Sequence, residues 1–223
     1  MRRQFEQEME QLHTHLIEMG AMCERAIDEA QRVLLENDAD AAEALILGDN
    51  EIDNKEKEIE HQCLKLMLRQ QPVASDLRRI SVAMKLITDM ERIGDQAADI
   101  AEIVKTGNIL SGEAEEICLG NMAEATKHMV TASIDAFVKE DKEKATDVIR
   151  YDDVVDRLFD ETREALIRRI SANTDGGWDA SQILDLLMVA KYYERIGDHA
   201  TNIAEWVIFG ITGEHINEYK TSV

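Results

Sequence analysis

The sequence has few of the residues that interrupt or cross-link helices. Its 223 residues include one proline and three cysteines, and aromatic residues make up 4% of the chain. The cysteines, Cys23, Cys63 and Cys118, are odd in number, widely spaced and without a Cys-x-x-Cys pair. This spacing argues against a disulfide framework and against a thiolate zinc site. We expect the cysteines to be small buried hydrophobes in a reducing compartment.

Long apolar runs and excess basic charge are also missing. No apolar run approaches the roughly 20 residues that span a bilayer, and residues 1–7 lack the apolar centre of a signal peptide. The chain has 25 Lys and Arg against 46 Asp and Glu, a formal net charge of −21. Such a field repels nucleic-acid phosphates and anionic membranes, and it favours cations and basic partners. We expect a cytoplasmic protein that binds no nucleic acid and does not insert into the membrane.

What the sequence does have is helical periodicity along its whole length. Apolar residues recur every three or four positions in six segments, at about 5–36, 40–70, 72–105, 113–139, 142–170 and 179–209. Turn and cap signals separate them, including Asn37-Asp38 and Gln71-Pro72. Pro72 suits the first turn of the third helix, where its missing N–H costs nothing. The fold class expected is all-α.

A pentapeptide reveals an internal duplication. Glu91-Arg92-Ile93-Gly94-Asp95 returns unchanged as Glu194-Arg195-Ile196-Gly197-Asp198, 103 positions later. The six helices therefore form two sets of three. We predict two tandem three-helix bundles, residues 1–107 and 108–223, or a single six-helix body with the same pseudo-twofold symmetry. Glycine inside a helix costs about 1 kcal/mol relative to alanine, so Gly94 and Gly197 indicate a close approach by a neighbouring backbone or ligand.

Pairs of acidic residues are duplicated with the pentapeptide. Asp49-x-x-x-Asp53 matches Asp152-x-x-x-Asp156, and Glu91-x-x-x-Asp95 matches Glu194-x-x-x-Asp198. On a helical wheel, the acids of the third and sixth helices face away from the apolar stripe of their own helix. Like charges four residues apart destabilise a helix by some tenths of a kcal/mol per pair, and a hard divalent cation would offset that cost. The pattern favours a carboxylate metal site in each half; a structural or recognition role without metal is the alternative.

Two kinds of segment resemble the PhoU family of phosphate-uptake regulators. They are Gln70–Arg79, which reads QQPVASDLRR, and the two Glu-Arg-Ile-Gly-Asp blocks. The likeness covers essentially the whole chain, although the second half has Asp175-Gly176-Gly177-Trp178 in place of the Gln-Pro segment. The resemblance implies an all-helical, cytoplasmic, commonly dimeric protein that is not an enzyme. Such a protein restrains phosphate uptake and the phosphate-starvation response, through contacts with the ATPase subunit of the phosphate ABC transporter and with its sensor histidine kinase.

The resemblance also implies metal ligands, because some members bind iron or zinc clusters through such acidic motifs. Carried onto this sequence, the first site comprises Asp49, Asp53, Glu91, Asp95 and Asp99, and the second comprises Asp152, Asp156, Glu194, Asp198 and Asn202. An amide is a poorer ligand than a carboxylate, so Asn202 predicts a weaker or differently populated second site. The cofactor implied is iron or zinc, with other divalent cations left open.

Two alternatives compete with this interpretation. A carboxylate-bridged di-iron oxidase or metal store, unrelated to phosphate, requires Glu-x-x-His from two helices of one bundle, projecting inward. The chain has Glu58-x-x-His61 once, and the equivalent Glu161-x-x-Glu164 lacks the histidine. A purely structural helical scaffold is the second alternative. No nucleophilic triad or glycine-rich phosphate loop is recognisable.

Overall fold

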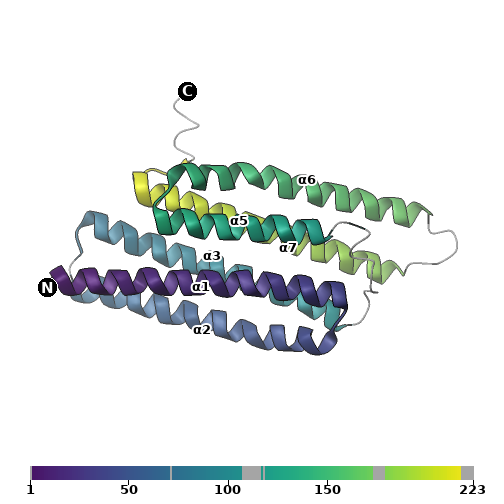
Figure 1. The fold of residues 1–223 in the computed structure, drawn as a ribbon, viewed down its shortest axis with the longest axis horizontal. Helices are drawn as coiled ribbons and strands as arrows, with labels where there is room; N and C mark the ends of the chain where they lie inside the picture. The colour runs from purple at the N-terminus through teal and green to yellow at the C-terminus, as the bar shows by residue number, and fades with distance from the viewer. Residues whose placement is uncertain (1, 71, 107–116, 118, 173–178, 217–223) are drawn as a thin grey trace, which may run out of the picture.

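The architecture is an assembly of six long helices (Figure 1). A computed structural model describes residues 2–70, 72–106, 117, 119–172 and 179–216, and within these ranges there is no strand. The helices are α1 (Arg2–Glu36), α2 (Ala39–Gln70), α3 (Ala74–Lys105), α5 (Leu119–Lys139), α6 (Lys142–Ala172) and α7 (Ala180–Thr212). The all-α prediction is confirmed, and the six helices fall at the six periodic segments.

The helices pack in two layers. Helices α2, α3, α7 and α6 lie side by side in that order, while α1 covers α2 and α3, and α5 covers α6 and α7. The two halves join where α3 packs against α7 and α1 against α5. One hydrophobic core runs continuously through both halves. The molecule is therefore a single six-helix body made of two three-helix bundles.

Helices α3 and α7 run antiparallel along the junction. Val82, near the start of α3, faces Gly210, near the end of α7. Asp89 and His199 meet further along the same pair of helices. An approximate twofold axis therefore crosses the α3–α7 contact, and it relates the first bundle to the second.

The two inter-helix turns that follow α1 and α5 are built alike. Asn37 and Glu140, which occupy equivalent positions of the duplication, both have positive φ, at 53° and 48°. The next residue in each turn is an aspartate whose Oδ1 accepts a hydrogen bond from the backbone three residues on. These bonds join Asp38 to Ala41 and Asp141 to Lys144, both at 3.0 Å. Each aspartate thereby satisfies a free N–H at the start of the next helix.

Some expected helix ends differ from the observed ones. Pro72 precedes α3, which begins at Ala74, because the chain is still extended at Val73. The fourth helix was expected from about residue 113; Ile117 lies in a turn and α5 begins at Leu119, while the expectation for residues 113–116 stays untested. Residues 107–116 and Cys118 lie outside the described ranges. Cys23 and Cys63 are free and fully buried, as expected.

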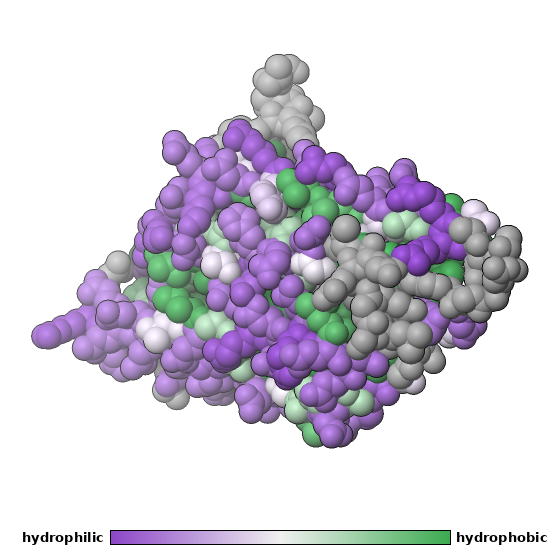
Figure 2. Space-filling model, turned by 45° about the vertical axis from the view of Figure 1, so that its right-hand side comes forward, coloured by the Kyte–Doolittle hydropathy of each residue, from purple (hydrophilic) through white to green (hydrophobic). Residues whose placement is uncertain are grey.

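The face of the molecule seen in Figure 2 is mostly polar. Figure 2 shows hydrophilic side chains over most of the visible face, with hydrophobic ones gathered in small patches. Over the described ranges, no helix combines the length and the apolar character needed to cross a membrane.

Candidate metal centre

The first candidate centre lies where α2 packs against α3, and we call this contact surface with its acidic side chains the first groove. Gly94 allows these two helices to approach closely. A Cβ atom at position 94 would lie 2.8 Å from Ile52 Cδ1 and 2.9 Å from Asp49 Oδ1, both too close for an ordinary contact. Alanine at this position therefore requires Ile52 or Asp49 to shift, and the atoms that approach Gly94 most closely are side-chain atoms of α2 rather than the backbone or ligand that was expected.

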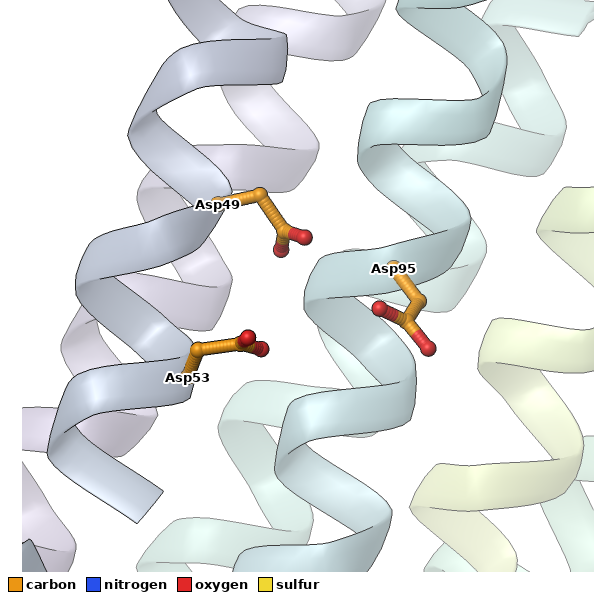
Figure 3. Close-up of side chains that lie close together, drawn as sticks. All are labelled: Asp49, Asp53 and Asp95. Carbon is orange, nitrogen blue, oxygen red and sulfur yellow. The ribbon is translucent and has the colours of Figure 1, made fainter. Parts of the chain in front are cut away.

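Three carboxylates converge in this groove. Asp49 and Asp53 project from α2 toward α3, where Asp95 lies (Figure 3). One oxygen from each of these three residues lies within 4.8 Å of the other two. Among the described residues, this is the one group of three His, Cys, Asp or Glu side chains so closely placed. The spacing lets a single cation contact all three.

The surroundings of Asp49 disfavour the charged form of its carboxyl group. Its Oδ1 is buried and lacks a hydrogen-bond partner among the described residues. Burial, followed by repulsion from Asp95, Asp53 and Asp99, raises the pKa of Asp49 to about 6. A buried carboxylate oxygen without a donor is costly, and a bound cation would satisfy it. The donor set and this free oxygen both fit a metal ion.

Glu91 and Asp99 lie at the two margins of the group. Arg92 shields one side, with Nη1 2.8 Å from Asp95 Oδ2 and Nε 3.3 Å from Glu91 Oε2. Burial, then Asp95, raises the pKa of Glu91. Burial, then Glu102 and Asp95, raises the pKa of Asp99, and Arg195 of α7 opposes that shift. Of the five ligands implied for the first site, the structure brings Asp49, Asp53 and Asp95 together and leaves these two beside them.

Glu56 is a further acid of this groove that sequence reasoning missed. It lies three residues after Asp53 and is half-buried. Burial, then Glu60 and Asp53, raises its pKa. Its equivalent in the second half is Phe159, so a search restricted to duplicated acids passes over it. Its spacing from Asp53 on the same helix face was the available signal.

The equivalent groove between α6 and α7 holds four acids. Burial, then Asp156, Asp198 and Glu194, raises the pKa of Asp152 to about 6. Burial, then Glu194, raises the pKa of Asp198, and Lys191 opposes this. Lys191 forms an ion pair with Glu194. The second groove therefore repeats the acidic pairs, with Lys191 paired to Glu194 where the first groove has Arg92 paired to Asp95 and Glu91.

Two further differences separate the grooves. A Cβ at Gly197 would lie 3.3 Å from Val155 Cγ1 and 3.6 Å from Asp152 Oδ1, so α6 and α7 approach less tightly. The side chain of Asn202 is directed across the junction, where its Nδ2 donates to Asp89 Oδ1 of α3 at 3.1 Å. This contact commits the Asn202 amide nitrogen to the other half and gives no support to its predicted role as a ligand.

The pair considered for a di-iron site lies on the surface. Glu58 forms an ion pair with Lys55 at 3.2 Å, and both Glu58 and His61 are exposed. An inward-facing Glu-x-x-His motif is therefore not formed at these positions, and the structure does not favour that alternative.

Comparisons with known proteins agree with this geometry. The family profile described as the PhoU domain matches twice, over residues 16–104 and 119–207. A Clostridium acetobutylicum protein named "Phosphate-specific transport system accessory protein PhoU homolog" is 38% identical, over 97% of this chain and 98% of its own length. The Escherichia coli "Phosphate-specific transport system accessory protein PhoU" is 29% identical, over 95% and 86% respectively.

Two crystal structures share the fold. PhoU from Pseudomonas aeruginosa superposes with a TM-score of 0.84 at 32% identity, covering 94% of this chain and all of that one. The phosphate transport system regulatory protein PhoU from Streptococcus pneumoniae gives a TM-score of 0.85 at 25% identity, covering 95% and 99%. The two matches of the family profile and the shared fold define a protein of two tandem PhoU domains.

The chain belongs to the PhoU family. The two matched segments begin and end 103 positions apart, in register with the pentapeptide, and one falls in each predicted half. The predicted boundary near residue 107 lies outside the described ranges and stays a prediction.

Proposed function

We propose that this protein is a non-catalytic, cytoplasmic regulator of phosphate uptake and phosphate-starvation signalling. It restrains the phosphate ABC transporter through the ATPase subunit, and it acts on the associated sensor histidine kinase. The observation that carries this proposal is the match of both halves to the PhoU domain. Relatives named for the phosphate-specific transport system also match almost the whole of this chain. We further propose that the working form is a homodimer.

The character of the surface supports an adaptor. The acids of both grooves and the net charge of −21 provide a negative field over a rigid helical body. Such a field accelerates encounter with basic protein surfaces and repels anions such as phosphate. Regulation through contact with transporter and kinase therefore suits this chain better than direct binding of phosphate.

Capture of partners tests the regulatory proposal. The tagged protein is incubated with the transporter ATPase and, separately, with the kinase, from cells grown with abundant or scarce phosphate. We expect retention of both partners, with an amount that depends on phosphate supply. Retention of neither partner under either condition overturns the proposal.

We also propose that the α2–α3 groove binds a divalent metal, iron or zinc, through Asp49, Asp53 and Asp95. When bound, the metal supplies positive charge that neutralises the converging carboxylates. The buried free oxygen of Asp49 supports this proposal. A carboxylate-only donor set suits hard cations, so magnesium, calcium and manganese belong in the same test.

The two grooves differ in charge, and we propose that they differ in affinity. The first groove collects Glu56 and Asp99 beside its duplicated acids, where the second has Phe159 and Asn202. Lys191 then neutralises part of the second groove, at the position where the first has Thr88. Cation affinity follows the net charge of the ligand set, so we expect the first groove to bind metal more tightly.

Elemental analysis of protein purified without chelator tests both metal proposals. Asp95→Ala and Asp198→Ala are matched variants, because the two residues are equivalent in the duplication. We expect Asp95→Ala to lose most of the bound metal and Asp198→Ala to lose less. Equal metal in the wild type and both variants, or none in any of them, removes these residues from the site.

A further inference from the structure

A small cleft lies on the junction between α3 and α7, next to the first groove. It encloses about 330 Å³, and its walls include Lys85 and Asp89 from α3 and Glu205 and Trp206 from α7. His215, just after α7, completes the aromatic side: its ring lies 5.4 Å from the Trp206 ring at a steep angle. The cleft therefore combines two carboxylates with an aromatic wall.

The carboxylate of Asp89 is held firmly at the cleft. Asp89 is buried, and its Oδ1 receives Asn202 Nδ2 at 3.1 Å and lies 2.9 Å from His199 Nδ1. Both contacts use the same oxygen, Oδ1, of a residue that lines the cleft. A carboxylate held in place by two side chains of α7 is preorganised to accept a donor from outside.

The aromatic wall already accepts a cation. Lys85 Nζ lies 5.5 Å from the centre of the Trp206 ring, within the range of a cation–π interaction. A guanidinium group stacks on indole and offers a planar set of donors that matches a carboxylate, so an arginine would use the ring and Asp89 together. Glu205 adds a second negative charge at the wall.

The duplication does not repeat this cleft. The equivalents of Lys85, Asp89 and Trp206 are Met188, Tyr192 and Ile103. Glu205 has an acidic equivalent, Glu102, but among the described residues no basic side chain lies over an indole at the other end of the junction. The cleft is thus a property of one end of the molecule, and the equivalent positions provide matched controls.

We propose that this cleft receives an arginine side chain from a basic segment of a partner protein. The inference rests on the proposed function, because it describes how the regulator binds its partner protein. Charge complementarity supports this occupant: the guanidinium meets two carboxylates on a chain of net charge −21 and takes the place of Lys85 over the indole. Lys85 is released toward solvent when the arginine enters.

Titration with a small probe tests the cleft directly. Isotope-labelled protein is titrated with N-acetyl-arginine amide, or with the neutral N-acetyl-citrulline amide, while the indole N–H resonance of Trp206 is followed by NMR. We expect a saturable shift of this resonance with the arginine probe and a much smaller one with citrulline. Equal responses to the two probes, or no saturable shift at Trp206, overturn the proposal.

Two matched pairs of variants sharpen the test. Glu205→Gln is expected to weaken arginine binding by roughly five- to tenfold, the effect of one partly exposed charge contact, while Glu102→Gln leaves it unchanged. Lys85→Met, which introduces the side chain found at the equivalent position, is expected to tighten binding more than Lys65→Met does at an exposed site on α2. Equal effects within either pair show a general field effect and overturn the assignment to the cleft.

Partner capture separates the two proposals. If the wild type retains the ATPase or the kinase, and Glu205→Gln loses it while Glu102→Gln does not, both proposals are supported. Retention by the wild type without a Trp206 response overturns the cleft and leaves the regulatory function intact. A Trp206 response without retention of either partner overturns the regulatory function instead.

Discussion

At the scale of single residues, Asp49 ties the stability of the protein to pH. Its pKa is raised from the usual 3.8 to about 6 in the folded protein, chiefly by burial. Because the folded pKa lies above the unfolded one, the stabilisation from Asp49 is complete below about pH 4 and is lost as the pH rises through 6. We expect chelator-treated protein to unfold at a higher temperature at pH 5 than at pH 7, and Asp49→Asn to reduce this difference.

A matched substitution separates the effect of burying Asp49 from the effect of the net charge of the protein. Removal of any carboxylate lowers the net negative charge, so Glu51→Gln, at an exposed position of α2, serves as the control. If the two variants show the same difference in melting temperature between pH 5 and pH 7, the burial of Asp49 is not the cause.

Gly94 and Gly197 are identical in sequence but differ in the space around them. Alanine at position 94 places Cβ against Ile52 Cδ1 and Asp49 Oδ1, at 2.8 and 2.9 Å, whereas the nearest atom at position 197 is Val155 Cγ1 at 3.3 Å. Alanine gains up to about 1 kcal/mol of helix propensity at either position, and overpacking costs about 1–3 kcal/mol. We expect urea unfolding to find Gly94→Ala less stable than Gly197→Ala by roughly 1–2 kcal/mol; equal stability contradicts the close approach at position 94.

The candidate site could be predicted from the sequence only in part, because duplication was the signal used. That signal finds Asp49, Asp53 and Asp95, which were expected to meet and do. It passes over Glu56, whose equivalent is a phenylalanine. The duplication also assigns Asn202 to the second site, as the equivalent of Asp99. It cannot show that the Asn202 amide is directed across the helix junction, because that direction depends on which helices pack together.

At the scale of the helices, the two matching turns give a test of capping. Asp38 and Asp141 each accept a backbone N–H at the start of the following helix, at the same distance of 3.0 Å. We expect Asp38→Ala and Asp141→Ala each to lower the free energy of unfolding by about 1 kcal/mol, and the asparagine variants to lose much less, because asparagine caps equally well. Thermal or urea unfolding measures this; an asparagine variant as unstable as its alanine counterpart contradicts a capping role.

Helix positions followed from periodicity, whereas some helix ends did not. Asn37-Asp38 marks its turn, since an asparagine tolerates positive φ and an aspartate caps the next helix. The start of α5 was harder to place. The sequence has an acceptable helical pattern from Glu113 onward, but Ile117 is buried in a turn before α5. Thr162 Oγ1 of α6 donates a hydrogen bond to the Ile117 carbonyl, a tertiary contact that no local pattern contains.

At the scale of the whole molecule, the junction between the halves gives a prediction about the first bundle alone. In the full chain, α1 and α3 pack against α5 and α7, so an isolated fragment of residues 1–106 exposes these apolar faces. Because the two bundles are related by an approximate twofold axis, a second copy can replace the missing half. We expect the fragment to form a dimer in light scattering after size exclusion.

Two variants of the fragment check where the copies meet. Val82 is buried against Gly210 of α7 in the full chain, so Val82→Glu is expected to give a monomer. Leu47 is 61% exposed, so Leu47→Glu is expected to leave the dimer intact. A wild-type fragment that is folded and monomeric would mean that the junction does not need a partner.

The junction itself was not specified by the sequence pattern. Apolar periodicity shows that each helix has a buried face, but α3 and α7 bury more than one face, against their own bundle and against each other. Gln96 is an example: a polar residue of α3 that becomes almost fully buried. The continuous core therefore had to be seen in the structure.

The antiparallel contact of α3 and α7 places both acidic grooves in one helical layer, on either side of the twofold axis. A single chain is thus bivalent toward any partner that recognises such a groove. A dimeric partner can engage both grooves at once. Its second contact then forms at a high effective concentration, which depends on the distance between the two grooves rather than on the concentration of the partner in the cell. The residues of the cleft at Trp206 are not repeated at the equivalent described positions of the other end, so the cleft makes the two ends of this binding surface different.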